Sequence, residues 1–191
     1  MSVQKLIIAK LTKIKPYSTL IDNYILNLYS NCLRMKIKLI LVGKTNEPYL
    51  QKGIDEYQSR LKHYISFERV EMPELKQVAA MTKDQIKLKE GALILKQVKE
   101  NDCVVLLDER GKMFSSIDWA RHLEHTLTHS SKDLIFVVGG GYGFSQEVYA
   151  RSDDKLSLSQ MTFSHQIVRL LFMEQLYRAF TIIKGEPYHH E

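Results

Sequence analysis

Short apolar runs that alternate with helix-like stretches constrain the fold of this 191-residue chain more than any other feature. The run from Cys103 to Leu107 is apolar throughout and stops at Asp108, which is typical of a buried strand in a parallel sheet. Residues 134–138 form a similar run, residues 36–42 begin in alternation and end apolar, and a glycine follows each segment. No two runs are joined by a hairpin turn. This order predicts an α/β fold with a mainly parallel sheet flanked by helices.

Capping residues mark where the helices between these strands begin. Thr82 and Gln85 have the spacing of a capping box, and serines at 115 and 145 precede two further helical runs. Glu109-Arg110-Gly111-Lys112 has the composition of a turn. We therefore expect helices over 49–64, 83–98, 116–129, 146–151 and 165–184, further strands at 65–72 and 156–159, and a turn at 109–112.

Residues 1–34 form an N-terminal appendage whose composition differs from that of residues 35–191. The charged side chains of the appendage are Lys5, Lys10, Lys13, Lys15 and Arg34 against Asp22. The whole chain has a net charge of +5, so residues 35–191 are close to neutral, and any RNA contact there needs a local basic patch. Two interpretations of the appendage stay open: a genuine N-terminal arm, or a start assigned upstream of Met35.

The cysteines and histidines of the chain favour a protein without a disulfide framework or a metal site. Cys32 and Cys103 lie far apart and outside any C-x-x-C spacing, which fits a reducing cytoplasm. His122, His125 and His129 recur at helical spacing, but no acidic or cysteine ligand accompanies them, so we expect an exposed polar face. No run is long enough for a membrane helix, and we expect a soluble, cytoplasmic protein.

A glycine-rich loop at residues 139–143 is the first candidate for a ligand site. It directly follows the expected strand 134–138, and open α/β sheets bind ligands at the carboxyl ends of their strands. Read as a dinucleotide fingerprint from Gly139, it has Phe144 where the last glycine belongs. Besides a cofactor loop, a tight turn that requires positive φ stays open as an interpretation.

A second loop, residues 159–163, leaves the neighbouring expected strand. Its backbone offers hydrogen-bonding groups beside Met161 and Phe163, which suits an adenine and a thioether chain. The alternative is a plain connection whose Met161 and Phe163 belong to the core. The helix that follows is apolar nearly all round, so we expect it to pack on its own sheet and on a second subunit.

Two charged groups on this last helix have alternative interpretations. Glu174 and Arg178 have the spacing of an i, i+4 ion pair, which accounts for both without a functional role. Arg169 aligns with Phe172 and Leu176, so it points toward a pocket or an interface rather than open water.

Five segments taken together resemble the ribosomal large-subunit methyltransferase H family, and the resemblance covers residues 35–191. The segments are Leu107-Asp108-Glu109-Arg110-Gly111-Lys112, residues 138–143, residues 158–165, Leu176-Tyr177-Arg178-Ala179 and Pro187-Tyr188-His189. The resemblance implies a SPOUT fold with a C-terminal trefoil knot in a homodimer. It also implies methyl transfer from S-adenosylmethionine to N3 of a pseudouridine in 23S rRNA, on assembled ribosomes.

The resemblance also assigns expected roles to residues. The cofactor-binding residues are Leu107, Gly140, Leu158, Ser159, Gln160, Met161, Thr162 and Phe163. The catalytic candidates are His165, Arg169, Arg178 and His189, and Tyr188 and His189 are expected to bind the substrate. Two positions depart from the family pattern, because Ser164 replaces a proline and His190 stands where a basic residue is common.

The expected chemistry is alignment of the two reactants plus removal of the proton on N3. His165 and His189 are both candidates for the base, and Arg169 or Arg178 would stabilise the developing anion. Two other functions stay open from the sequence: a nucleotide-dependent enzyme that uses the glycine loop, and a ribosome-binding module without catalysis.

Overall fold

The computed structural model of the chain describes residues 35–189. The predicted appendage, residues 1–34, and the departure at His190 lie outside them. The strands are β1 (Lys36–Val42), β2 (Ser66–Met72), β3 (Cys103–Lys112), β4 (Leu134–Val138) and β5 (Asp154–Leu156). The helices are α3 (Pro48–Leu61), the 3-10 helix η1 (Val78–Ala80), α4 (Lys83–Lys96), α5 (Ser116–His129), α6 (Gln146–Arg151) and α7 (Ile167–Lys184).

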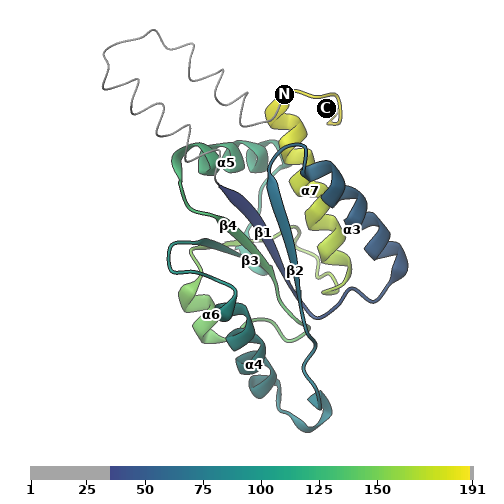
Figure 1. Ribbon diagram of the computed structural model, residues 1–191, viewed down its shortest axis with the longest axis vertical. Helices are drawn as coiled ribbons and strands as arrows, with labels where there is room; N and C mark the ends of the chain where they lie inside the picture. Colours follow the sequence, from purple (N-terminus) through teal and green to yellow (C-terminus); the bar gives the residue numbers. More distant parts are fainter. Residues whose placement is uncertain (1–34, 190–191) are drawn as a thin grey trace.

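The strands form one sheet in the order β2-β1-β4-β3-β5, and each adjacent pair is parallel. The predicted α/β class with a mainly parallel sheet is confirmed. Figure 1 shows α3 and α7 side by side on one side of the sheet, with α4 and α6 together on the other. All five strands therefore end at the same edge, where the connecting loops gather.

Local sequence signals explain where several helices begin and end. The Thr82 hydroxyl accepts a hydrogen bond from the Gln85 amide at 3.2 Å, and the Gln85 side chain accepts one from the Thr82 amide at 2.9 Å. This is the predicted capping box of α4. The Ser115 hydroxyl likewise accepts from the Asp118 amide at the start of α5. Gly185 ends α7 with a φ of 68°, a left-handed conformation that favours glycine.

Two predictions near the carboxyl edge were wrong. The expected turn at 109–112 is part of β3, which continues irregularly until Lys112 pairs with Leu156. A Cβ on Gly111 would lie 2.6 Å from backbone atoms of β5, so glycine is present for close strand approach and not for a turn. The last strand is Asp154–Leu156 and not 156–159, and residues 157–159 belong to the loop that follows it.

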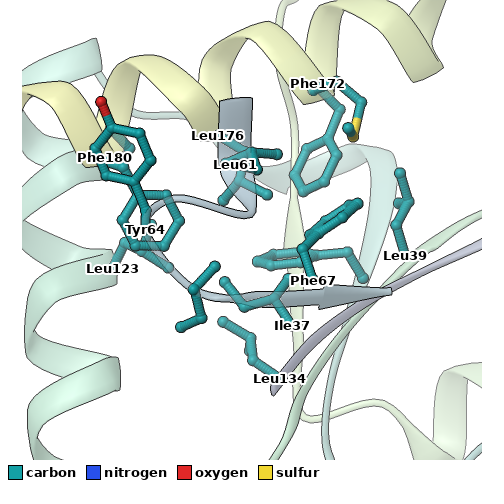
Figure 2. Packing of buried hydrophobic residues seen from close by; sticks show 14 of the residues in the cluster. Ile37, Leu39, Leu61, Tyr64, Phe67, Leu123, Leu134, Phe172, Leu176 and Phe180 are labelled. Atoms are coloured by element: carbon teal, nitrogen blue, oxygen red, sulfur yellow. The ribbon is translucent and has the colours of Figure 1, made fainter. Parts of the chain in front are cut away.

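Side chains at alternate strand positions belong to two hydrophobic cores, one on each face of the sheet. The larger core takes Ile37, Leu39 and Leu41 from β1 and packs them against α3, α5 and α7. Figure 2 shows Phe172, Leu176 and Phe180 of α7 in this core, with Ile37 and Leu39 among the strand residues beneath them. The smaller core takes Ile40 and Val42 toward α4 and α6. Both faces are therefore covered, as a parallel sheet requires.

Candidate functional site

The two loops singled out in the sequence line one pocket at the carboxyl edge of the sheet. Its volume is about 560 Å³, which lies in the range of small-molecule sites. The glycine loop follows β4, the loop 157–165 follows β5, and the irregular end of β3 closes a third side. Residues more than fifty positions apart therefore face one cavity.

Most of the expected cofactor-binding residues line this pocket. Those that do are Leu107, Gly140, Leu158, Ser159, Met161, Thr162 and Phe163. Gln160 lies in the same loop but does not line the pocket. Met161 and Phe163 are 75% and 37% exposed, so the interpretation that both belong to the hydrophobic core is wrong.

Gly140 occupies a position that has no room for a side chain. A Cβ at this position would lie 2.6 Å and 2.8 Å from the carboxylate oxygens of Glu90 on α4. One of these oxygens is buried and has no hydrogen-bond partner, and burial raises the pKa of the Glu90 carboxyl. Glu90 therefore packs directly against the glycine loop and does not line the pocket.

Several pocket residues were not predicted. Asp108 lies at the pocket wall, and its carboxylate accepts a 2.5 Å hydrogen bond from the Tyr149 hydroxyl of α6. Burial and this hydrogen bond raise the pKa of Tyr149 to about 12. Asp108 was recognisable from its place directly after an apolar run, but Tyr149 and Lys87 carry no local signal, because only the folded chain brings them here.

Among the catalytic candidates, His165 is the one that lines the pocket. It precedes α7 and belongs to the loop that carries Met161 and Phe163. Partial burial and the charge of Arg169 hold the pKa of His165 below its ordinary value. This shift favours the neutral imidazole, which is the form able to accept a proton.

Arg169 is fully buried and does not line the pocket. Its guanidinium donates to the carbonyl oxygens of Val42 at 2.6 Å and Gly43 at 3.1 Å, and to the Thr45 hydroxyl at 3.0 Å. Its Nε donates to the His165 carbonyl oxygen at 2.9 Å. Arg169 thus ties the end of β1 to the loop before α7. In this way it holds the backbone of His165 in position.

Ser164 contributes to the same junction. Its hydroxyl accepts a 3.3 Å hydrogen bond from the Ile167 amide, and its carbonyl oxygen accepts one from the Val168 amide at 3.1 Å. A proline at this position would lack the hydroxyl. Ser164 therefore provides an acceptor for the first amide of α7.

The remaining candidates form a cluster at the far end of α7. Arg178 donates to Glu174 through Nε at 2.9 Å and Nη2 at 2.5 Å, and its Nη1 lies 3.4 Å from Nδ1 of His189. The predicted i, i+4 ion pair is present. The Arg178 guanidinium also lies over the Tyr188 ring, 4.8 Å from its centroid.

Tyr57 of α3 completes this cluster, which we call the C-terminal cluster: Tyr57, Glu174, Arg178, Tyr188 and His189. The hydroxyls of Tyr57 and Tyr188 lie 3.3 Å apart, and Tyr188 donates to Glu174 at 3.3 Å. Burial and the Tyr57 hydroxyl raise the pKa of Tyr188. Tyr57 and Glu174 were not predicted as site residues, although both fix the orientation of predicted ones.

The pocket and the C-terminal cluster lie at different positions along α7. Val168 lines the pocket, and Arg178 follows it ten residues later on the same helix, which corresponds to about 15 Å along the axis. In Figure 1 the segment that follows α7 leaves the helix at the end opposite to the loop that enters it. The four catalytic candidates therefore do not meet within one chain.

Within residues 35–189, no group of three or more His, Cys, Asp or Glu side chains is placed to hold a metal ion. His125 and His129 stack on each other at 4.2 Å between ring centroids, whereas His122 stacks on Phe114 at 5.0 Å. In the same part of the chain, no helix combines the length and apolar character that a membrane crossing requires.

Comparisons with known proteins agree on one family. Residues 35–189 match the family described as Predicted SPOUT methyltransferase. The Ribosomal RNA large subunit methyltransferase H of Christiangramia forsetii is 55% identical over 156 residues, which cover 82% of this chain and 99% of the relative. Proteins of the same name from Parabacteroides distasonis and Bacteroides fragilis are 52% and 51% identical over 157 residues, covering 82% of this chain and 100% of each relative.

Proposed function

The chain belongs to the SPOUT methyltransferase family, and on that basis we propose that it methylates N3 of a pseudouridine in 23S rRNA of the assembled ribosome. We further propose S-adenosylmethionine as the methyl donor. Relatives that are about half identical over nearly their whole length are named ribosomal RNA large subunit methyltransferase H, which supports the rRNA substrate. The observation that carries the proposal is the pocket between the glycine loop and the loop after β5.

The residues of the pocket fit this donor. Gly140 lets the loop pack closely against Glu90, and the apolar side chains of Met161 and Phe163 can cover an adenine or a thioether chain. The charged groups of the lining are balanced, with Asp108 and Glu109 beside Lys87 and Arg110. When bound, S-adenosylmethionine supplies an activated methyl group.

The protein itself then has to orient the base and remove its N3 proton. His165 is the base that the geometry favours, because it lines the pocket and its lowered pKa keeps it neutral. Arg169 holds the His165 backbone in place. Arg178 and His189 would contact the base or the anion that develops on it.

We propose that a homodimer brings these residues together. The C-terminal cluster lies too far along α7 to reach the pocket of its own chain, so a partner subunit has to present it. A two-fold contact that includes α7 would place the cluster of one protomer at the pocket of the other. Within its own chain α7 packs on the sheet, α3 and α5, and the proposal adds a second subunit to these partners.

The remaining expectations stay part of the proposal. They are a C-terminal trefoil knot, a cytoplasmic location, and residues 35–191 as one SPOUT domain that follows an appendage at 1–34. The alternative of a nucleotide-dependent enzyme loses support, because the glycine loop lacks the last glycine of a dinucleotide fingerprint. The buried Phe144 stands at that position.

Calorimetric titration with S-adenosylmethionine, followed by incubation with ribosomes that lack the modification, tests the proposal. We expect one cofactor site per chain and a single added methyl group on a pseudouridine, located by mass mapping of the rRNA. Binding of a dinucleotide in place of S-adenosylmethionine would support the nucleotide-dependent alternative. Ribosome binding without cofactor binding would support the non-catalytic module.

A further inference from the structure

The rim of the pocket carries exposed apolar side chains next to lysines. Tyr142 of the glycine loop is 46% exposed and lines the pocket. Met161 and Phe163 on the opposite loop are exposed as well. Few large apolar side chains of residues 35–189 are this exposed, and several of those that are surround one opening, which is typical of a binding surface.

Helix α4 places two lysines beside Tyr142. The Lys83 ammonium lies 5.9 Å from the centroid of the Tyr142 ring, within cation–π range. Lys87 follows four residues later on the same helix face and lines the pocket. Lys87 pairs with Asp84 at 3.6 Å, but the Asp84 side chain is almost fully exposed, so a phosphate can replace this weak pair.

An aromatic ring with one ammonium group in cation–π range, and a second lysine on the lining of the same pocket, matches the chemistry of an unstacked nucleotide. Single-stranded RNA is bound by stacking of its bases on aromatic side chains and by lysine contacts to its phosphates. The arrangement also lies where a substrate has to arrive, at the mouth of the pocket rather than inside it. A cofactor held between the two loops would not need Lys83, which does not line the pocket.

We propose that Tyr142, Lys83 and Lys87 dock an rRNA nucleotide that flanks the methylated base. Tyr142 stacks on the base of this nucleotide, and the two lysines contact its phosphates. The inference rests on the proposed function, because it assumes an rRNA substrate. It adds a substrate-positioning surface on α4 and the glycine loop to the pocket and the C-terminal cluster.

The test compares variants in steady-state methylation of ribosomes that lack the modification. We expect Tyr142→Ala to raise the KM for ribosomes about 10-fold, because loss of base stacking on an aromatic ring has effects of this size. Tyr142→Phe keeps the aromatic face and should restore a near-normal KM. Lys83→Ala should raise the KM. It should also reduce, by about one, the slope of the logarithm of the ribosome binding constant against the logarithm of the salt concentration.

Matched controls come from the same helix. Leu88 and Lys89 of α4 are exposed and do not line the pocket, so Leu88→Ala and Lys89→Ala should leave the KM for ribosomes unchanged. Calorimetry with S-adenosylmethionine, without ribosomes, should give the same dissociation constant for Lys83→Ala as for the unmodified protein. Thermal unfolding of each variant separates lost binding from lost folding.

Three outcomes would overturn the proposal. An unchanged KM in Tyr142→Ala would remove the stacking role. A weaker cofactor affinity without a change in the KM for ribosomes would assign Tyr142 to the cofactor. A shift of Tyr142→Ala toward monomers in sedimentation would show that a partner subunit covers the rim of the pocket. Failure of the unmodified protein to methylate ribosomes would contradict the proposed function itself, and this outcome is distinct from the other three.

Discussion

Arg169 has its guanidinium among backbone acceptors and not in the pocket, which makes it a structural residue at the site's edge. We expect Arg169→Ala to lower the free energy of unfolding by about 3 kcal/mol, because buried carbonyl groups lose a charged donor. Urea denaturation measures this loss. Arg121→Ala is the control, because Arg121 is 74% exposed and pairs with Asp118 on the surface of α5. Unchanged stability with abolished turnover would instead give Arg169 a direct catalytic role.

Gly140 and Gly141 are neighbours with different surroundings. A Cβ at 140 would meet the Glu90 carboxylate at 2.6 Å, whereas a Cβ at 141 meets only His165 Nδ1 at 3.9 Å. We expect Gly140→Ala to weaken S-adenosylmethionine binding at least about 10-fold and Gly141→Ala to have little effect, as measured by calorimetry. Adding Glu90→Ala to Gly140→Ala should recover part of the affinity. Equal losses in both glycine variants would show that Glu90 is not the obstacle.

The lowered pKa of His165 predicts the pH dependence of the reaction. A base whose pKa lies below the ordinary value of about 6.5 is deprotonated at neutral pH, so kcat/KM should rise with pH only below that value and then level off. Stopped assays from pH 5 to 9 give the profile. His165→Ala should lose most of the turnover together with the acidic limb. An unchanged limb in this variant would assign the base to another group, such as His189.

At the scale of elements, the contact between β3 and β5 positions the loop 157–165, which lines the pocket. β5 is short, and the loop that holds Met161 and Phe163 follows directly from it. Gly111→Ala would force a Cβ to within 2.6 Å of the β5 backbone, and backbone atoms cannot move aside as a flexible side chain can. We therefore expect both a lower melting temperature and weaker cofactor binding.

Gly53→Ala is the control for this prediction. Gly53 also lies in a tight contact, but its neighbour is the Leu170 side chain at 2.9 Å, between α3 and α7. We expect Gly53→Ala to lower stability without weakening cofactor binding. Normal cofactor affinity in Gly111→Ala would show that the loop does not depend on the β3–β5 contact.

The sequence predicted some of these elements correctly and others wrongly. Apolar runs and capping residues, such as Thr82 with Gln85, predicted the parallel class and most helices, because these signals are local. The segment around Gly111 was mispredicted as a turn, because glycine marks turns and close strand contacts alike. The roles of Arg169 and Tyr57 depend on partners more than a hundred residues away, which no local pattern contains.

For the whole molecule, the distance between the pocket and the C-terminal cluster predicts that each active site needs two chains. A protomer with a disabled pocket, Gly140→Ala, still has an intact cluster. A protomer with a disabled cluster, Arg178→Ala, still has an intact pocket. In a mixed dimer, the intact pocket of one chain faces the intact cluster of the other, so one of its two sites is complete.

Mixing the two variants should therefore restore activity at an S-adenosylmethionine concentration too low to saturate Gly140→Ala. If equal amounts are unfolded together and refolded, half of the dimers are mixed, and about one quarter of the original sites should be active. Methyl incorporation into ribosomes measures the recovery, and each variant refolded alone gives the baseline. Refolded unmodified protein corrects for losses in the procedure. A mixture no more active than its components would mean that pocket and cluster serve the same chain, which the length of α7 makes hard to reconcile with direct contact to one base.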